Sequence, residues 1–325
     1  MMVRTMFLGI VALAALVAGC EPLNTPNDGE LSSADIAELR QMILSDPLYT
    51  NDAAVLNDGD DAPSFSTLGK AATPIIPLHW GRRIASVARE MTFEQVDDTT
   101  VIATVTHKLE GTIFIVAKYS NSDTARTIIQ KPLSEQTQRR IKFYRAARSD
   151  APNSNGNVRR GWRPAEVSAS QGGTQNAQLA ITKLELTAGD RTIEITEPLE
   201  YFLELQGNGR HKIRPLIFNV GTRQPLTVRL TLVSADPDTD WVSIHRPLAL
   251  MNPNRPDLVK PMHERMVLVS QTPSGANFER VYEATWETFV QGRHAFFVTA
   301  VTRSSIFDDQ AAFSSQVWGV PYITE

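Results

Sequence analysis

The amino-acid sequence predicts a mainly β protein with two folded parts: an α+β unit with an antiparallel sheet, then a sandwich of antiparallel sheets. Residues 99–109 and 112–119 alternate between apolar and polar side chains around a Glu-Gly pair, which is typical of an antiparallel hairpin. Short β-rich runs separated by turn residues follow one another from residue 179 to 302, which is typical of a sandwich. Between the two parts, residues 169–178 contain Gly172 and Gly173 and no large apolar side chain, so we expect a linker there.

The composition is that of a globular protein. Hydrophobic residues make up 42% of the chain and charged residues 21%, which excludes a largely disordered protein. The net charge of −4 does not favour a polyanion as the partner of the whole chain. Because there is only one cysteine, the chain has no internal disulfide and its stability must depend on its core.

Residues 1–19 have the order of an export signal. Arg4 is the only charged residue among them, and it precedes an apolar run from Met6 to Ala18. This run is too short to cross about 30 Å of hydrocarbon, which takes about 20 apolar residues. A positive start, a short apolar core and small residues before a cleavage point are typical of a signal peptide. We therefore expect residues 1–19 to be removed.

The end of this segment, Val17-Ala18-Gly19-Cys20, resembles the lipobox of bacterial lipoproteins. In that family the chain is cut before the cysteine, whose sulfur carries a diacylglycerol. The resemblance implies that Cys20 is lipidated and that its acyl chains, palmitate among them, attach the protein to a membrane of the bacterial cell envelope. Glu21 is not the aspartate known for inner-membrane retention, which favours the outer membrane. The alternative is a buried or signal-anchor helix with a chance cysteine.

Residues 20–74 are predicted to be a tether that contains one short amphipathic helix. Residues 21–31 are rich in Pro, Asn, Asp and Gly and have no apolar period. Ser32 or Ser33 is the expected N-cap, with Asp35 in the first turn and the end of the helix before Pro47. The residues with helical spacing are Ile36, Leu39, Ile43 and Leu44.

Residues 75–168 form the expected α+β unit. Strands are predicted at 99–109, 112–119, 126–131 and 139–147 and from Trp162 onward, while 84–91 fits a helix or a strand. A few helical turns followed by long antiparallel strands resemble, in layout only, the cystatin-like and nuclear-transport-factor-like folds. These folds can enclose a small ligand.

Residues 179–325 form the expected sandwich. The run from Gly292 to Ala300 resembles a late strand of bacterial immunoglobulin-like or fibronectin-like domains, in which a glycine turn precedes alternating inward residues. The sequence departs from that family in lacking a disulfide pair and in placing His294 where a corner tyrosine is expected. The predicted strands are 179–187, 191–196, 213–220, 226–233, 241–246, 265–270, 280–289 and 294–302.

Basic residues are concentrated between positions 139 and 163. In an exported protein such a cluster could bind the phosphates of anionic envelope lipid or polysaccharide, whereas nucleic acid is not an expected partner in this compartment. The alternative is a strand with a solvated basic face. On a strand, Arg140 and Lys142 would share one face and Arg139 the other. The candidate anion-binding residues are Arg139, Arg140, Lys142, Arg145, Arg148, Arg159, Arg160 and Arg163.

No metal site is predicted from the histidines, because all six are scattered singly and none has the spacing of a zinc motif. Asp236, Asp238 and Asp240 resemble the first ligands of a calcium loop, but Trp241 stands where that loop needs glycine. A loop calcium and a polar hairpin connection both remain open.

No catalytic residue and no cofactor is predicted, because the chain has no G-x-S-x-G, Walker or dinucleotide-binding pattern. The leading hypothesis is a lipid-anchored cell-envelope protein with a non-enzymatic binding or assembly role, whose partner is the envelope surface or another envelope protein. One alternative is a carbohydrate-active or other hydrolytic lipoprotein with dispersed carboxylates. The other is a small-ligand-binding lipoprotein.

Overall fold

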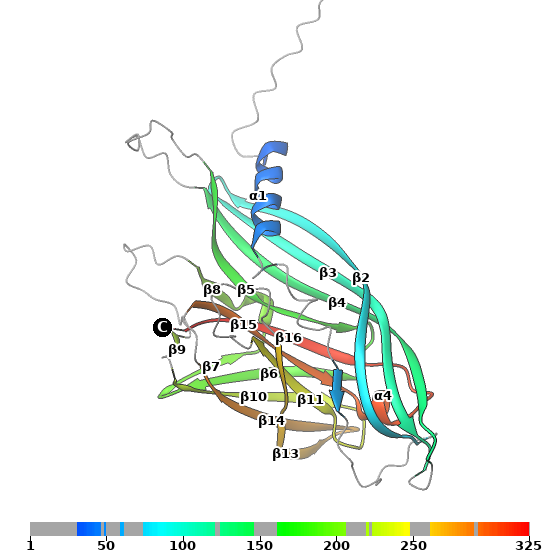
Figure 1. Cartoon of the computed structure of the whole chain (residues 1–325). Helices are drawn as coiled ribbons and strands as arrows, with labels where there is room; N and C mark the ends of the chain where they lie inside the picture. The colour runs from blue at the N-terminus through cyan, green and yellow to red at the C-terminus, as the bar shows by residue number, and fades with distance from the viewer. Residues whose placement is uncertain are drawn as a thin grey trace, which may run out of the picture.

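The structure is a computed structural model that describes residues 31–46, 49, 59–61, 74–120, 124–145, 161–205, 219–220, 223–247, 261–288 and 292–324. It is mainly β, with antiparallel sheets and a sandwich-like lower half, as the sequence predicts (Figure 1). The predicted signal peptide, Cys20 and most of the predicted tether lie outside the described residues. Within the part that is described, no helix has the length and apolar character needed to cross a bilayer.

The predicted helix is α1, Ser33–Ser45, and it begins and ends as expected. Ser32 is the N-cap: its hydroxyl accepts from the Asp35 backbone N–H, and the Asp35 carboxylate accepts from the Ser32 N–H. Leu39 and Ile43 are buried. Leu44, which we expected on the same face, is 50% exposed because one residue is a rotation of about 100° and carries it off the apolar stripe.

In the described part of the chain, the larger sheet has eleven strands. Its main order is β1-β2-β3-β4-β5-β16-β15-β11-β12, with β8 paired to β5 and β9 paired to β16. The bounds are β1 Gly59–Asp61, β2 Ile76–Asp97, β3 Thr100–Lys118, β4 Thr127–Arg145, β5 Trp162–Thr174, β8 Phe202–Glu204, β9 Asn219–Val220, β11 Trp241–Pro247, β12 Pro261–Arg265, β15 Gly292–Val301 and β16 Ser315–Thr324. Residues 84–91, which fitted a helix or a strand, lie in β2.

The hairpin predicted within residues 99–119 is wrong. Both halves belong to the single strand β3, which continues through Gly111. The glycine does not turn the chain; it lets β2 approach, because a Cβ at Gly111 would lie 2.0 Å from the backbone oxygen of Arg83. The pairing of β2 with β3 also shifts register between Ile84 and Ser86.

Residues 169–174, expected within a linker, are the second half of β5. This strand pairs with β4 through Gln136↔Gly173 and with β16 through Gln316↔Gly173. Its small residues reflect close packing: a Cβ at Gly172 would lie 2.1 Å from the Gln136 oxygen, and one at Gly173 would lie 2.2 Å from the Ser315 oxygen. The large sheet is therefore continuous across the predicted boundary.

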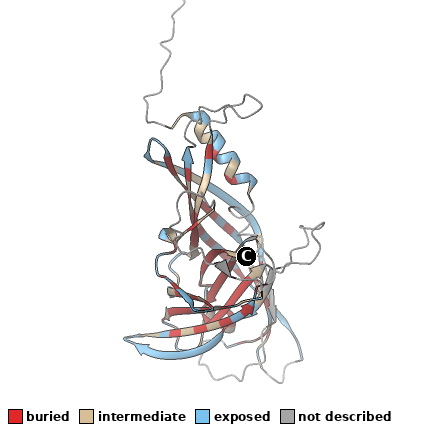
Figure 2. Cartoon of the chain, turned by 90° about the vertical axis from the view of Figure 1, so that its left-hand side faces the viewer, coloured by how far each residue is buried: buried red, intermediate tan, exposed pale blue. Residues whose placement is uncertain are grey.

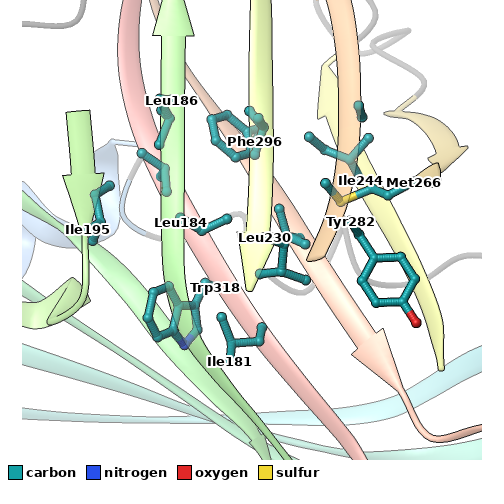
Figure 3. Packing of buried hydrophobic residues seen from close by; sticks show 14 of the residues in the cluster. Ile181, Leu184, Leu186, Ile195, Leu230, Ile244, Met266, Tyr282, Phe296 and Trp318 are labelled. Carbon is teal, nitrogen blue, oxygen red and sulfur yellow. The ribbon is translucent and has the colours of Figure 1, made fainter. Parts of the chain in front are cut away.

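A second sheet of five strands has the order β13-β14-β10-β6-β7. It packs on the β16-β15-β11 part of the large sheet (Figure 3), where Leu184, Leu230 and Tyr282 of the small sheet share a core with Phe296 and Trp318 of the large one. The bounds are β6 Leu179–Ala188, β7 Arg191–Ile195, β10 Pro225–Ser234, β13 Val267–Ser274 and β14 Asn277–Glu287. The 3₁₀ turn η1, Pro198–Glu200, and the short helix α4, Arg303–Phe307, complete the described elements.

The chain passes from one sheet to the other at Met266. This residue is buried in the sandwich core, and its N–H donates to the Val242 oxygen at 2.9 Å. The strand before it, β12, is the end strand of the large sheet, and the strand after it, β13, is the end strand of the small sheet. One continuous segment thus forms an edge of both sheets.

Asp35 joins α1 to the large sheet. Its Oδ1 accepts from the indole Nε1 of Trp162 at 2.8 Å and from Nη2 of Arg145 at 2.7 Å. Burial opposes ionisation of the carboxyl, but the hydrogen bonds from Ser32, Trp162 and Arg145 outweigh it and lower the pKa of Asp35 to about 2. The ionised carboxylate therefore stabilises the docked helix.

Replacing Asp35 by Asn tests this contribution. The folded-state pKa lies below the ordinary value of 3.8, so the stabilisation is present above pH 3.8 and is lost as the pH falls toward 2. We expect Asp35→Asn to lower the unfolding free energy by about 1–2 kcal/mol at pH 7 and by much less at pH 2.5, measured by urea unfolding. Glu38→Gln, an exposed change on the same helix, is the control. A loss that is equal at both pH values would contradict the assignment.

Candidate functional site

The predicted basic cluster lies mainly on β4, where it divides between two faces as expected. Arg139 is buried, and its Nη2 donates to the Ser170 hydroxyl at 3.4 Å. Arg140 and Lys142 lie on the opposite, partly exposed face. Arg163 is exposed on β5, whereas Arg148, Arg159 and Arg160 lie outside the described residues.

Three of the described cations of this cluster are paired with carboxylates from other elements. Arg140 binds Glu200 of η1, and Lys142 Nζ lies 2.7 Å from Oε2 of Glu166 on β5. Arg145, at the end of β4, binds Asp35 of α1 and stacks on Trp162. The pairs join η1, β5 and α1 to β4. The partly exposed side of β4 consequently has less net positive charge than the sequence suggests.

A second polar cluster, which the sequence analysis missed, is buried on the same face as Arg139. Nη1 of Arg82 on β2 lies 3.4 Å from Oε2 of Glu135 on β4, and the other oxygen of Glu135 accepts from the Ser315 hydroxyl of β16. These residues are 53 and 180 positions apart, so no sequence spacing reveals them. A buried pair of this kind stabilises the fold only weakly, and here it links β2 to β4 and, through Ser315, to β16.

Lys131 makes another buried connection between the two halves of the sequence. Its Nζ donates to the backbone oxygens of Ser305 at 2.7 Å and Asp308 at 2.5 Å, at the C-terminal end of α4. Burial lowers the pKa of Lys131 to about 8, although Asp308 and Asp309 act in the opposite direction. The ammonium therefore serves as a cap for α4, because cations favour helix C-termini.

The aspartate-rich turn between β10 and β11 is held by protein groups. Asp236 accepts from the Ser304 N–H at 2.9 Å with Oδ2 and from the Asp238 N–H at 3.1 Å with Oδ1. Asp238 faces Arg303, with 3.6 Å between its Oδ2 and Nε of the arginine. The loop has the arrangement of a polar connection between strands. Within the described ranges, no three side chains of His, Cys, Asp or Glu gather closely enough to hold a metal ion.

Asp240, the last residue of this turn, forms a buried pair with Arg280 of β14. The Asp240 Oδ2 lies 2.5 Å from Nη1 of Arg280, and neither side chain is exposed (0%). Ser234 donates to the other carboxylate oxygen at 2.8 Å, and Nη2 of Arg280 donates to the Asp236 backbone oxygen. Burial raises the pKa of Asp240 to about 6, although Arg280 and Ser234 act in the opposite direction.

Two of the histidines that are separate in sequence stack on each other. His245 of β11 and His263 of β12 are cross-strand partners, with ring centroids 4.5 Å apart and planes at 19°. They lie at the edge of the large sheet, where Met266 leads into β13.

Among the strands whose burial is described, β13 is the most exposed, and its exposure was not predicted from the sequence. Every residue of it is exposed, including Val267 at 69%, Leu268 at 36% and Val269 at 52% (Figure 2). It is an end strand, and it carries no charged residue. Soluble proteins commonly protect such edges with charges, proline or bulges, and β13 has Pro273 and a register shift but no charge. The missed signal is the run of three aliphatic residues, which breaks the alternation of a half-buried strand.

Three other end strands follow the usual pattern. In the described part of the chain the two-residue outer strand β9 carries no charge, whereas β1, β7 and β12 carry charged residues and β12 also begins with a proline. These residues are Asp60 and Asp61 in β1, Arg191 and Glu194 in β7, and Pro261, Glu264 and Arg265 in β12. β13 is therefore the candidate interaction site of this structure.

We compared the chain with models of protein families, with curated proteins and with solved structures, and none of the three comparisons gave a match.

Breaking the Asp240–Arg280 pair tests the role of the aspartate-rich turn. Asp240→Ala leaves the Arg280 charge buried without a carboxylate, so we expect the unfolding free energy to fall by about 3–5 kcal/mol. Asp238→Ala, which removes a longer and partly exposed pair, should cost less than about 1 kcal/mol. The double variant Asp240→Asn with Arg280→Met should be more stable than Asp240→Ala alone. Equal losses in all three variants by urea unfolding would contradict a buried charge pair.

Proposed function

We propose that this chain is a lipid-anchored protein of the bacterial cell envelope that acts by binding another protein through the edge strand β13. The observation that carries the proposal is the exposure of three consecutive aliphatic side chains on an uncharged end strand. Such an edge offers unpaired backbone N–H and C=O groups to a further strand. Strand addition of this kind is a common mode of protein recognition.

The anchor in this proposal rests on the sequence. The apolar run and the Val-Ala-Gly-Cys ending lead to one cysteine, and Cys20 is the only cysteine of the chain. Two acyl chains on that residue give stable membrane attachment, whereas one acyl chain gives only reversible attachment. Residues 21–30 would then separate the folded part from the membrane surface.

The ion pairs of the described residues support a binding role over a catalytic one. Five carboxylates from different elements each bind an arginine or lysine, so they serve in holding the fold together. They are Asp35, Glu135, Glu166, Glu200 and Asp240. The same pairs reduce the support for an anionic lipid or polysaccharide as the partner, because they neutralise three of the candidate anion-binding residues.

Lipidation of Cys20 is tested by expression of the full chain in a bacterial host. We expect an N-terminal peptide that begins at Cys20 and carries the mass of a diacylglycerol, and we expect the protein in the membrane fraction. Cys20→Ser should leave the signal peptide uncleaved. Recovery of the unaltered protein in the soluble fraction with an N-terminus other than Cys20 would refute the anchor.

Binding through β13 is tested by placing a photo-crosslinking amino acid at Val267 of the full chain in cells. We expect adducts from this position and none from Ile128, a matched aliphatic residue of β4 that is 63% exposed. The short reach of the probe limits adducts to groups that touch the edge. If the two positions give the same adducts, or if neither gives any, β13 is not the binding site.

A further inference from the structure

We propose that the strand bound by β13 is β13 of a second copy of this chain, paired antiparallel about a twofold axis. This inference rests on the proposed function, since it identifies the partner of the same edge. In a twofold contact each copy presents the same surface, so the strand must be complementary to itself. The sequence and surroundings of β13 meet this condition.

The absence of charge on β13 is the first argument. Twofold pairing places a strand against its own copy, so a charged residue near the axis meets a like charge. β13 has none among its eight residues. An axis near Ser270 would bring the aliphatic residues 267–269 of one copy toward residues 271–273 of the other, so no charged residue of β13 meets a like charge.

The charges behind the edge are too distant to oppose this pairing. Glu279 and Glu283 of β14 lie beside β13, and Arg229 Nε binds Glu283 at 2.5 Å. In the pair, the two β14 strands would be separated by three strand spacings, or about 14 Å. This exceeds the Debye length of about 8 Å at physiological salt, so the remaining repulsion between these carboxylates is screened.

The contact area is the second argument, and it predicts a weak pair. β13 is about 27 Å long, and its register shift between Leu268 and Ser270 and its Pro273 shorten the part that can pair. A single strand edge of this length buries less than the roughly 1,200–2,000 Å² of stable protein complexes. Pairs of this kind become effective only where many copies face one another.

The position of β13 determines how the two anchors would be placed. Figures 1 and 2 both show α1 at one end of the molecule and β13 at the other. The predicted tether of residues 21–31 precedes α1 and reaches at most about 40 Å when fully extended. A twofold pair through β13 therefore places its two anchors at opposite ends, so each pair would connect two facing membranes.

The test uses the mature chain from residue 20, with Cys20→Ser and an N-terminal polyhistidine tag, on phosphatidylcholine vesicles that contain a nickel-chelating lipid. We expect the chain to cluster the vesicles, as measured by light scattering, and imidazole to reverse the clustering. In solution, analytical ultracentrifugation at high concentration should show a monomer–dimer equilibrium. The double variant Val267→Lys with Val269→Lys should abolish clustering and weaken dimerisation at least about tenfold.

Ile128→Lys is the matched control, because it places the same charge at an exposed aliphatic residue outside β13. It should cluster vesicles as the parent chain does, and all variants should have the same melting temperature. A chain that stays monomeric and does not cluster vesicles overturns the inference, as does clustering that the lysines leave unchanged. Because the tag replaces the lipid, this result does not depend on lipidation. A crosslinked adduct at Val267 with the mass of a different protein would uphold binding at β13 and refute self-pairing.

Discussion

The large sheet depends on the close approach of β4, β5, β16 and β15 at three glycines. A Cβ at Gly172 or Gly173 would collide with the backbone of β4 or β16, and one at Gly319 would lie 2.5 Å from the ring of Phe297. Gly173 also has a φ of +145°, a conformation that favours glycine. At these positions the large sheet continues from the long strands β2, β3 and β4 through β5 into β16 and β15, which pack against the small sheet. A side chain at any of them would require the neighbouring strands or side chains to move.

The same glycines explain where sequence reasoning succeeded and where it failed. The N-cap at Ser32 and the buried face of α1 were predictable, because they depend on neighbouring residues and on a regular period. The β-rich character and the sandwich were predictable from alternation. Residues 169–174 were not, because small residues indicate a linker in sequence but a close strand contact in space. Gly111 was expected to turn the chain for the same reason, but it accommodates β2 and β3 continues through it.

The candidate site was predictable only in part. Alternation on β4 correctly placed Arg139 on one face and Arg140 with Lys142 on the other. The carboxylates that pair with these cations come from η1, β5 and α1, and the sequence gives no spacing for such partners. A count of basic residues therefore overestimated the free positive charge. The exposure of β13 was predictable only in part, because the run Val267–Val269 breaks the alternation of a half-buried strand, but the sheet order that makes β13 an end strand is not visible in the sequence.

The distribution of charge distinguishes β13 from the end strands β1, β7 and β12. This structure uses charged pairs where segments distant in sequence must be held together, as at Arg280 with Asp240 and at Arg82 with Glu135. Pairs without exposed surface specify an arrangement because an unpaired charge there is costly. The end strands β1, β7 and β12 carry charges of their own, which discourage the addition of another strand. β13 carries no charge, and only Pro273 and the register shift after Leu268 interrupt it, so its aliphatic residues are the part of this edge that the proposed partner strand would cover.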